Sequence, residues 1–152
     1  MLTKLRSTAT GALAVAALVT GAVLSSAGTA SAHAYGDRLY RGETLQPGES
    51  ISRSGIDGLG GYLLWRLVMQ TDGNLVEYKI NRYGHSRVCW ASDSNNGARN
   101  HAVYQHDGNF VVYGPSGQVM WASHTMGHAG ETVDINASGA VYVGHTRISG
   151  AC

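Results

Sequence analysis

Charged residues, proline, cysteine and long apolar runs are scarce in this chain of 152 residues, and each scarcity narrows what the protein can be. Charged residues make up 14% of the chain and form no basic stripe, so nucleic acid is not an expected partner. Beyond the first 34 residues no second apolar run could cross a membrane, so we expect no membrane insertion. The same part of the chain shows no sustained helical periodicity, which points away from a helical fold.

Sequence signatures of common enzymes are absent as well. There is no Gly-x-Ser-x-Gly nucleophile elbow and no cysteine–histidine signature. Asp72 and Asp107 belong to two copies of a repeat described below, so they should lie too far apart to act as a glycosidase pair. The histidines are scattered, and His124 and His128 lie in a glycine-bearing segment that does not predict a helix. We therefore predict no enzymatic activity, no metal site and no cofactor.

The first 34 residues read as a secretory signal peptide. Lys4 and Arg6 form a short basic region, the uncharged apolar run Gly11–Leu24 follows, and small residues precede two possible cleavage points, after Ala32 or after Ala34. The alternative is a membrane anchor, but the run is short and rich in alanine, glycine and threonine. We predict a secreted, extracellular protein with one mature domain, residues 35–152.

Two cysteines, Cys89 and Cys152, are present. In an exported chain they have one intramolecular pairing, which would tie the end of the chain to the middle of the domain. The chain-entropy model gives such a bridge a stabilisation of about 4 kcal/mol. The alternative is a bond between molecules through Cys152. Without the leader, nine lysines and arginines stand against ten acidic residues, so the formal charge is about −1.

What the chain does contain is a nine-residue pattern, Gln-x-Asp-x-Asn-x-Val-x-Tyr, that occurs twice, 35 residues apart. The first copy is QTDGNLVEY and the second is QHDGNFVVY. Because side chains alternate between the two faces of a strand, each copy can present one chemical face. We refer to the two sets as the first site (Gln70, Asp72, Asn74, Val76 and Tyr78) and the second site (Gln105, Asp107, Asn109, Val111 and Tyr113).

The repetition extends beyond this motif. The segment 88–92 (VCWAS) is answered by 119–123 (VMWAS), and the first repeat carries four extra residues that we place in the loop 81–85. A third, eroded copy keeps a glycine but none of the motif residues, at Asn136, Ser138, Ala140, Tyr142 and Gly144. Three units of 30 to 35 residues predict a pseudo-threefold fold around a shared core.

Short strands between turn residues predict an all-β domain. We expect strands over 38–40, 50–53, 62–70, 74–80, 87–91, 102–105, 109–113, 118–122, 131–135 and 140–143. The three tryptophans, Trp65, Trp90 and Trp121, are expected to fill the core rather than to stack on a ligand.

The Asp-Gly pair inside each motif predicts a hairpin with a three-residue loop. This loop would pair Gln70 with Asn74 and place the motif residues on the outer face, with Met69 and Leu75 pointing inward. The same register points Tyr104, Phe110 and Val112 inward in the second repeat. Glu77 also falls on the inward face, and we expect it near a sheet end with access to water.

The chemistry of the repeated face suits a polyhydroxylated ligand. A sugar hydroxyl both donates and accepts hydrogen bonds, and the motif offers carboxylate acceptors beside amide donors. A valine can cover an apolar C–H patch of the sugar without competing for its hydroxyls. Each site would be shallow and weak, and two sites would raise the apparent affinity for a glycan-dense surface.

The twin motif, the WAS segments and the opening GETLQPGE resemble the bulb-type mannose-binding lectins, over essentially the whole mature chain. The resemblance implies a β-prism II fold of three four-stranded antiparallel sheets. It also implies that Asp72 and Asn74 bind the 2-hydroxyl of mannose, Gln70 the 3-hydroxyl and Tyr78 the 4-hydroxyl, with Val76 against C3–C4. The corresponding residues of the second site would take the same roles, and the third repeat would bind no mannose.

The expected partners are therefore mannose-containing glycans on cell surfaces. An alternative is a lectin-like bacteriocin or defence protein that uses the same scaffold to target a cell, which killing of related strains by the purified protein would reveal. Plant members close a disulfide within one repeat and often exchange a C-terminal strand. A Cys89–Cys152 bond would pin that segment within its own chain, so we expect a monomer or a differently built homodimer.

Overall fold

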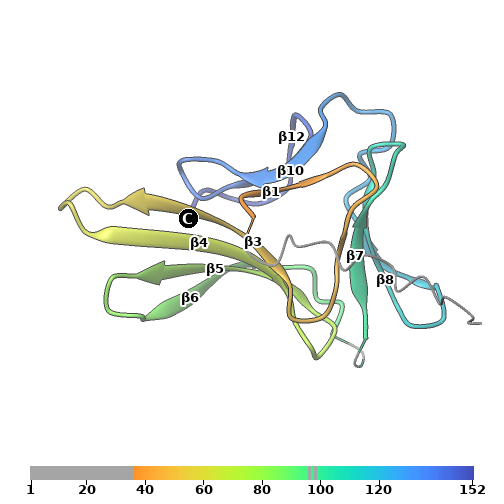
Figure 1. Cartoon of the computed structure of the whole chain (residues 1–152), viewed down its shortest axis with the longest axis horizontal. Coiled ribbons are helices and arrows are strands. Elements are labelled where there is room, and N and C mark those ends of the chain that lie inside the picture. The colour runs from red at the N-terminus through yellow and green to blue at the C-terminus, as the bar shows by residue number, and fades with distance from the viewer. Residues whose placement is uncertain (1–35, 96, 98) are drawn as a thin grey trace, which may run out of the picture.

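The computed structural model describes residues 36–95, 97 and 99–152, so the predicted signal peptide lies outside the described residues. Within this part, twelve strands form three antiparallel sheets of four strands each (Figure 1). In order, the strands of sheet A are β1 (Arg38–Tyr40), β10 (Thr132–Ile135), β11 (Val141–Val143) and β12 (Thr146–Arg147). Those of sheet B are β2 (Thr44–Leu45), β7 (His101–Tyr104), β8 (Phe110–Tyr113) and β9 (Val119–Ala122). Those of sheet C are β3 (Ser50–Ile56), β4 (Tyr62–Met69), β5 (Leu75–Asn81) and β6 (Ser86–Ala91).

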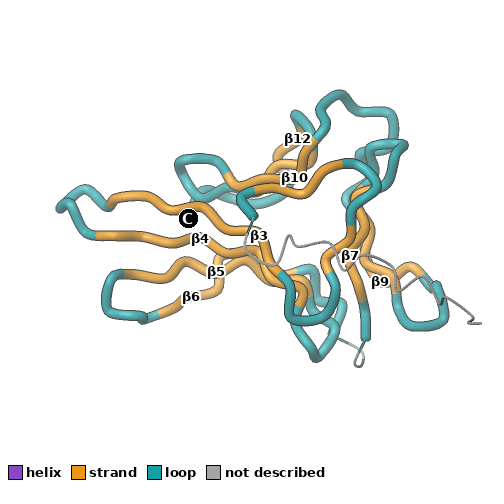
Figure 2. The backbone as a smooth tube through the Cα atoms, in the orientation of Figure 1, coloured by secondary structure: helices purple, strands orange, loops and turns teal. Residues whose placement is uncertain are grey.

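The all-β prediction is confirmed, and Figure 2 shows the described chain as strands joined by loops. No helix among the described residues is long and apolar enough to span a bilayer. The ten expected strands are present with small differences at their ends, and the structure adds β2 and β12. Each of these has two residues, which is too short for an alternating pattern to be recognised in the sequence.

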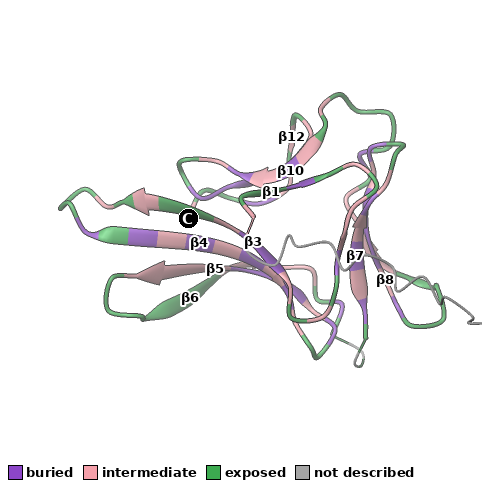
Figure 3. Cartoon of the chain, in the orientation of Figure 1, coloured by how far each residue is buried: buried purple, intermediate pink, exposed green. Residues whose placement is uncertain are grey.

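One core serves all three sheets. Each of the long strands alternates buried residues with partly exposed ones, as the banding of β4 in Figure 3 shows. The inward residues meet in a single cluster to which every sheet contributes, with Leu39 from sheet A, Leu45 from sheet B and Ile51 from sheet C all fully buried. Three short sheets that each cover only one face are stable because they bury that face against the other two.

The tryptophans fit this core unequally. Trp65 belongs to the buried cluster, as expected. Trp90 and Trp121 are only partly buried and pack against the cluster from the last strand of their own repeat. Their rings meet edge to face with centroids 5.2 Å apart, so they join sheets B and C to each other.

The motif hairpins have the predicted register. The Gln70 N–H donates to the Asn74 carbonyl oxygen at 2.8 Å, and the Gly73 N–H donates to the Gln70 carbonyl oxygen at 3.1 Å. Gly73 has a φ of +93°, the left-handed conformation that glycine adopts without a steric cost. The second and third repeats form the same turn, with Gly108 at +90° and Gly139 at +70°.

Sheet C extends beyond the other two sheets, and its two hairpins project to one side in Figure 1. We expected the four extra residues of the first repeat in the loop 81–85, and this was wrong. The β5–β6 turn has the same hydrogen bonds as the β8–β9 turn, from Asn81 N–H to the His85 carbonyl and from Gly114 N–H to the Gln118 carbonyl. The additional residues instead lengthen β5 and β6, because they pair with each other as a regular ladder.

Glu77 departs from its prediction. Its side chain is fully buried, with no access to water, where we expected a position at a sheet end. Its Oε2 accepts a hydrogen bond of 2.9 Å from the Ser149 hydroxyl, while Oε1 has no partner. Burial raises the pKa of Glu77 to about 7, and the Ser149 hydrogen bond only partly opposes that rise.

The end of the chain is tied to sheet C. Cys89 and Cys152 form the predicted intramolecular disulfide, across a sequence separation of 63. Lys79 Nζ and Arg87 Nη2 both donate to the carbonyl oxygen of Cys152, at 2.7 and 2.8 Å. The Cys152 N–H donates in turn to the Ser138 carbonyl oxygen in sheet A. The terminal segment therefore bridges sheets A and C within one chain.

Candidate functional site

The first site lies on the outer face of the β4–β5 hairpin. Met69 and Leu75 beside the turn are fully buried, so Gln70 and Asn74 next to them face away from the core. Asp72 is exposed at the tip of the turn, where its Oδ1 accepts a 3.0 Å hydrogen bond from the Asn74 N–H. This local bond is the usual way in which an aspartate closes a turn, and it leaves the other carboxylate oxygen open.

Tyr78 and Gln70 form a pair across the site. The Gln70 side-chain amide donates to the Tyr78 hydroxyl oxygen at 2.8 Å. Because the phenol accepts this bond, its own hydrogen is free to be donated to a ligand. The Gln70 amide oxygen is a further open acceptor, since no other hydrogen bond to these two side chains occurs within the described residues.

The orientation of the Asn74 amide is set from below. Its Oδ1 accepts the Ser94 backbone N–H at 3.2 Å and the Ser92 hydroxyl at 3.0 Å. A backbone N–H can only face an acceptor, so the amide nitrogen must point outward as a donor. The motif did not reveal this support. Ser92 is the serine of the repeated WAS segment, so that repeat was the signal that could have identified it.

The second site repeats this arrangement on the β7–β8 hairpin of sheet B. The corresponding bonds are Gln105 Nε2 to Tyr113 Oη at 2.8 Å and Asn109 N–H to Asp107 Oδ1 at 2.9 Å. The Asn109 Oδ1 accepts from the Ser123 hydroxyl and from the Thr125 N–H, both at 3.2 Å. The second site thus presents the same open acceptors and donors as the first.

The two motif valines lie at the base of their sites. Val76 and Val111 are on the outer face but only 3% and 2% exposed, because neighbouring side chains cover them. They therefore support the polar groups above them and offer little open apolar surface in this conformation.

Comparison with known proteins identifies the scaffold. No family model matches the chain. A mannose-specific lectin of Narcissus pseudonarcissus is 38% identical over 78 residues, which are 51% of this chain and 59% of that relative. The chain therefore spans less than two thirds of the length of the curated relative it matches.

Two solved structures match over more of the fold. The mannose-specific agglutinin from snowdrop (Galanthus nivalis) bulbs, complexed with methyl-α-D-mannoside, is 30% identical, with a TM-score of 0.57 over 72% of this chain and 90% of that chain. A lectin from Allium sativum is 33% identical, with a TM-score of 0.56 over 74% of this chain and 96% of that chain. The chain belongs to the bulb-type mannose-binding lectin family.

Membership of this family confirms the predicted β-prism II fold of three four-stranded sheets. The matched bulb-type proteins are lectins, which bind carbohydrate without catalysis, in agreement with the prediction that this protein is not an enzyme. The geometry also separates the two motif aspartates, because Asp72 lies in the central turn of sheet C and Asp107 in that of sheet B. Among the described residues, no group of three or more possible metal ligands is present.

The third repeat keeps the bulb-type turn without the open groups. Asn136 takes the position of the motif glutamine, but its Oδ1 accepts the N–H groups of Ser138 and Ala140 at 3.0 and 2.9 Å. Ala140 replaces the motif asparagine, and Gly144 replaces the tyrosine. Side chains that could point donors and acceptors outward are therefore missing on this sheet.

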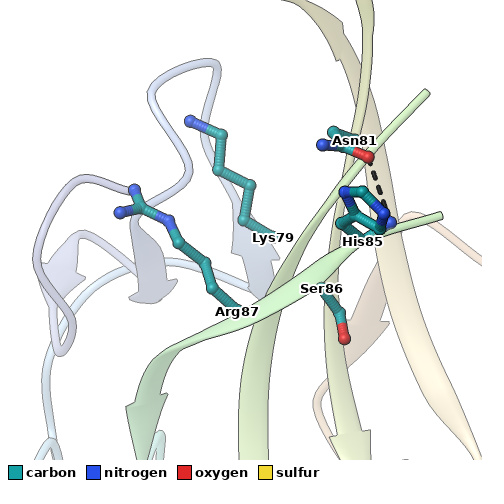
Figure 4. A pocket seen from close by; sticks show the side chains of 5 residues that line it. All are labelled: Lys79, Asn81, His85, Ser86 and Arg87. Atoms are coloured by element: carbon teal, nitrogen blue, oxygen red, sulfur yellow. Dashed lines mark hydrogen bonds between the residues drawn. The ribbon is translucent and has the colours of Figure 1, made fainter. Parts of the chain in front are cut away.

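A separate pocket of about 210 Å³ lies where sheet C extends beyond the prism (Figure 4). Its lining residues are Lys79, Asn81, His85, Ser86 and Arg87. Lys79 and Arg87 are cross-strand neighbours, and both already donate to the Cys152 carbonyl. Lys79 also lies over the ring of the inward-facing Trp65, so the pocket opens on the side of the sheet opposite the first site.

Proposed function

We propose that this protein is a carbohydrate-binding lectin that recognises α-mannose or a similar sugar through the first and second sites. The observation that carries the proposal is the duplication of the hydrogen-bond pattern in the two repeats. In each site the fold itself satisfies one side of every polar group and leaves the other side open. Such prearranged donors and acceptors lose little freedom when a ligand binds.

The open groups fit a mannose ring in one orientation. Asp72 and Asn74 offer an acceptor and a donor side by side, which suits the axial 2-hydroxyl. Gln70 then reaches the 3-hydroxyl, and the free hydrogen of the Tyr78 hydroxyl reaches the 4-hydroxyl. Equivalent roles fall to the second site. The similarity to a snowdrop agglutinin complexed with methyl-α-D-mannoside supports this choice of sugar.

Mannose-containing glycans on cell surfaces are the partners we propose, and secretion would bring the protein to them. The signal-like first 34 residues and the Cys89–Cys152 disulfide support an extracellular location. Because that disulfide holds the terminal segment within its own chain, we propose a monomer or a homodimer without strand exchange.

Titration calorimetry with methyl α-mannoside tests the binding proposal. Asp72→Ala and Asp107→Ala should each halve the stoichiometry, and the double variant should release no heat of binding. Ser138→Ala is the matched control, since it changes the equivalent position of the third repeat and should leave binding unchanged. Absence of binding by the folded wild-type protein would refute the assignment to mannose.

A further inference from the structure

The first and second sites differ in one neighbouring residue. Arg66 on β4 is the direct cross-strand partner of Tyr78, and His101 on β7 is the partner of Tyr113. The corresponding position of the third repeat is Thr132, whose carbonyl oxygen accepts the Gly144 N–H. Side chains of directly opposed residues on one face of a sheet lie about 5 Å apart, so each partner borders the tyrosine of its site.

The second site shows that this neighbour reaches the tyrosine. The centroids of the His101 and Tyr113 rings are 6.0 Å apart. Arg66 has a longer side chain on the same outer face, where it alternates with the buried Trp65 and Leu67. A cation therefore stands at the tyrosine end of the first site, and an imidazole stands at the same end of the second.

Arg66 is not committed to a partner within the protein. Its Nε is buried and has no hydrogen-bond acceptor, and no salt bridge to Arg66 occurs within the described residues. It is also the only charged residue on the outward-facing strand positions of sheet C, because the others at those positions are apolar or hydroxyl-bearing. An unpaired guanidinium on such a surface is a strong binding group for carboxylate or phosphate.

We propose that Arg66 makes the first site selective for mannosides that carry an anionic substituent, carboxylate or phosphate, at C6. This inference rests on the proposed function. With the 4-hydroxyl at Tyr78, ring atom C5 and its C6 substituent follow at the same end of the sugar, next to Arg66. The guanidinium then donates to the anionic oxygens, while Gln70, Asp72 and Asn74 hold the 2- and 3-hydroxyls as they do for the neutral sugar.

Single-site proteins separate the two sites. Asp107→Ala retains the first site and Asp72→Ala retains the second, and each is titrated with methyl α-mannoside, methyl α-mannosiduronate and mannose 6-phosphate. We expect the anionic ligands to bind the first site about fivefold more tightly than the neutral mannoside, and the second site without that preference at pH 7.5. Arg66→Gln in the Asp107→Ala protein should abolish the preference and change neutral binding less than twofold.

A reciprocal change provides the matched control. His101→Arg in the Asp72→Ala protein should create the preference in the second site. Acetate and inorganic phosphate are added as competitors to distinguish a substituent of the bound sugar from a free anion. Displacement by these ions of the anionic sugar but not of the neutral one, only at high ion concentration, is the expected result.

Three results would overturn the inference. Equal affinity of neutral and anionic mannosides for the Asp107→Ala protein would remove the selectivity, while leaving the proposed function intact. Equal loss of both affinities in Arg66→Gln would show that Arg66 only supports Tyr78. Binding of acetate or phosphate as tightly as the anionic sugar would show an independent anion site. If no mannoside binds the Asp107→Ala protein, the proposed function and this inference fall together.

Discussion

The buried Glu77 makes the stability of this protein depend on pH in an unusual direction. A carboxyl group with a raised pKa in the folded state holds its proton there at pH values where the unfolded chain has lost it. Between the ordinary value of 4.5 and about 7, the folded state therefore binds more protons than the unfolded state. The free energy of unfolding should fall as the pH rises through this window and level off above pH 7.

The size of the effect follows from the same two values. One pKa unit corresponds to about 1.4 kcal/mol, so the difference between 4.5 and about 7 corresponds to about 3 kcal/mol. Hydrogen bonding favours the neutral form too. Ser149 Oγ already accepts the Val141 N–H at 2.8 Å, and it has one proton to share between Glu77 Oε2 and the Gly150 carbonyl. A protonated Glu77 can donate to Ser149 and free that proton for Gly150.

Glu77→Gln isolates this contribution, because the amide has the same shape and does not ionise. The variant should match the wild type near pH 4.5 and exceed its free energy of unfolding by about 3 kcal/mol at pH 8, or by about 10 °C in Tm. Urea denaturation followed by tryptophan fluorescence from pH 4 to pH 9 measures both proteins. Glu131→Gln is the control, since that carboxylate has a side-chain exposure of 76%.

The difference between variant and wild type is the quantity to follow. Asp57 titrates with the opposite sign, because the Gly61 and Leu59 N–H groups lower its pKa and its contribution is lost as the pH falls. That contribution is common to both proteins and cancels. If the two pH profiles run parallel from pH 4 to pH 9, the carboxyl group of Glu77 is not held neutral by burial and the reasoning is refuted.

Two further predictions concern the support of the first site and the end of the chain. Ser92→Ala removes a donor from Asn74 Oδ1, so calorimetry in the Asp107→Ala background should show affinity for methyl α-mannoside lowered about fivefold, with no change in the Asp72→Ala background; an unaltered first site would contradict this role. Replacing Cys89 and Cys152 by serine should lower the free energy of unfolding by about 4 kcal/mol in urea, whereas reductant should affect only the wild type; a loss below about 1 kcal/mol would show that the terminal segment is held without the bond.

Much of the candidate site was predictable because its signals are local. The Asp-Gly pair and the spacing from Gln70 to Asn74 select one turn, and the turn selects the register. Alternation then decides which residues face outward, since a strand has a period of two. The support beneath Asn74 was missed for the opposite reason. Ser92 and Ser94 reach it from the next strand, 18 and 20 residues along the chain.

The sequence by itself thus determined the three repeats, the inward and outward faces, both polar motifs and the loss of the third. Each of these follows from residue spacing within one hairpin. Only the tertiary structure decided that Glu77 is buried, because its burial depends on Ser149, which is 72 residues away in another sheet. It also decided that Arg66 borders Tyr78, because cross-strand neighbours are set by the pairing of β4 with β5. Contacts between elements depend on how the sheets close around their common core, and no local pattern encodes that closure.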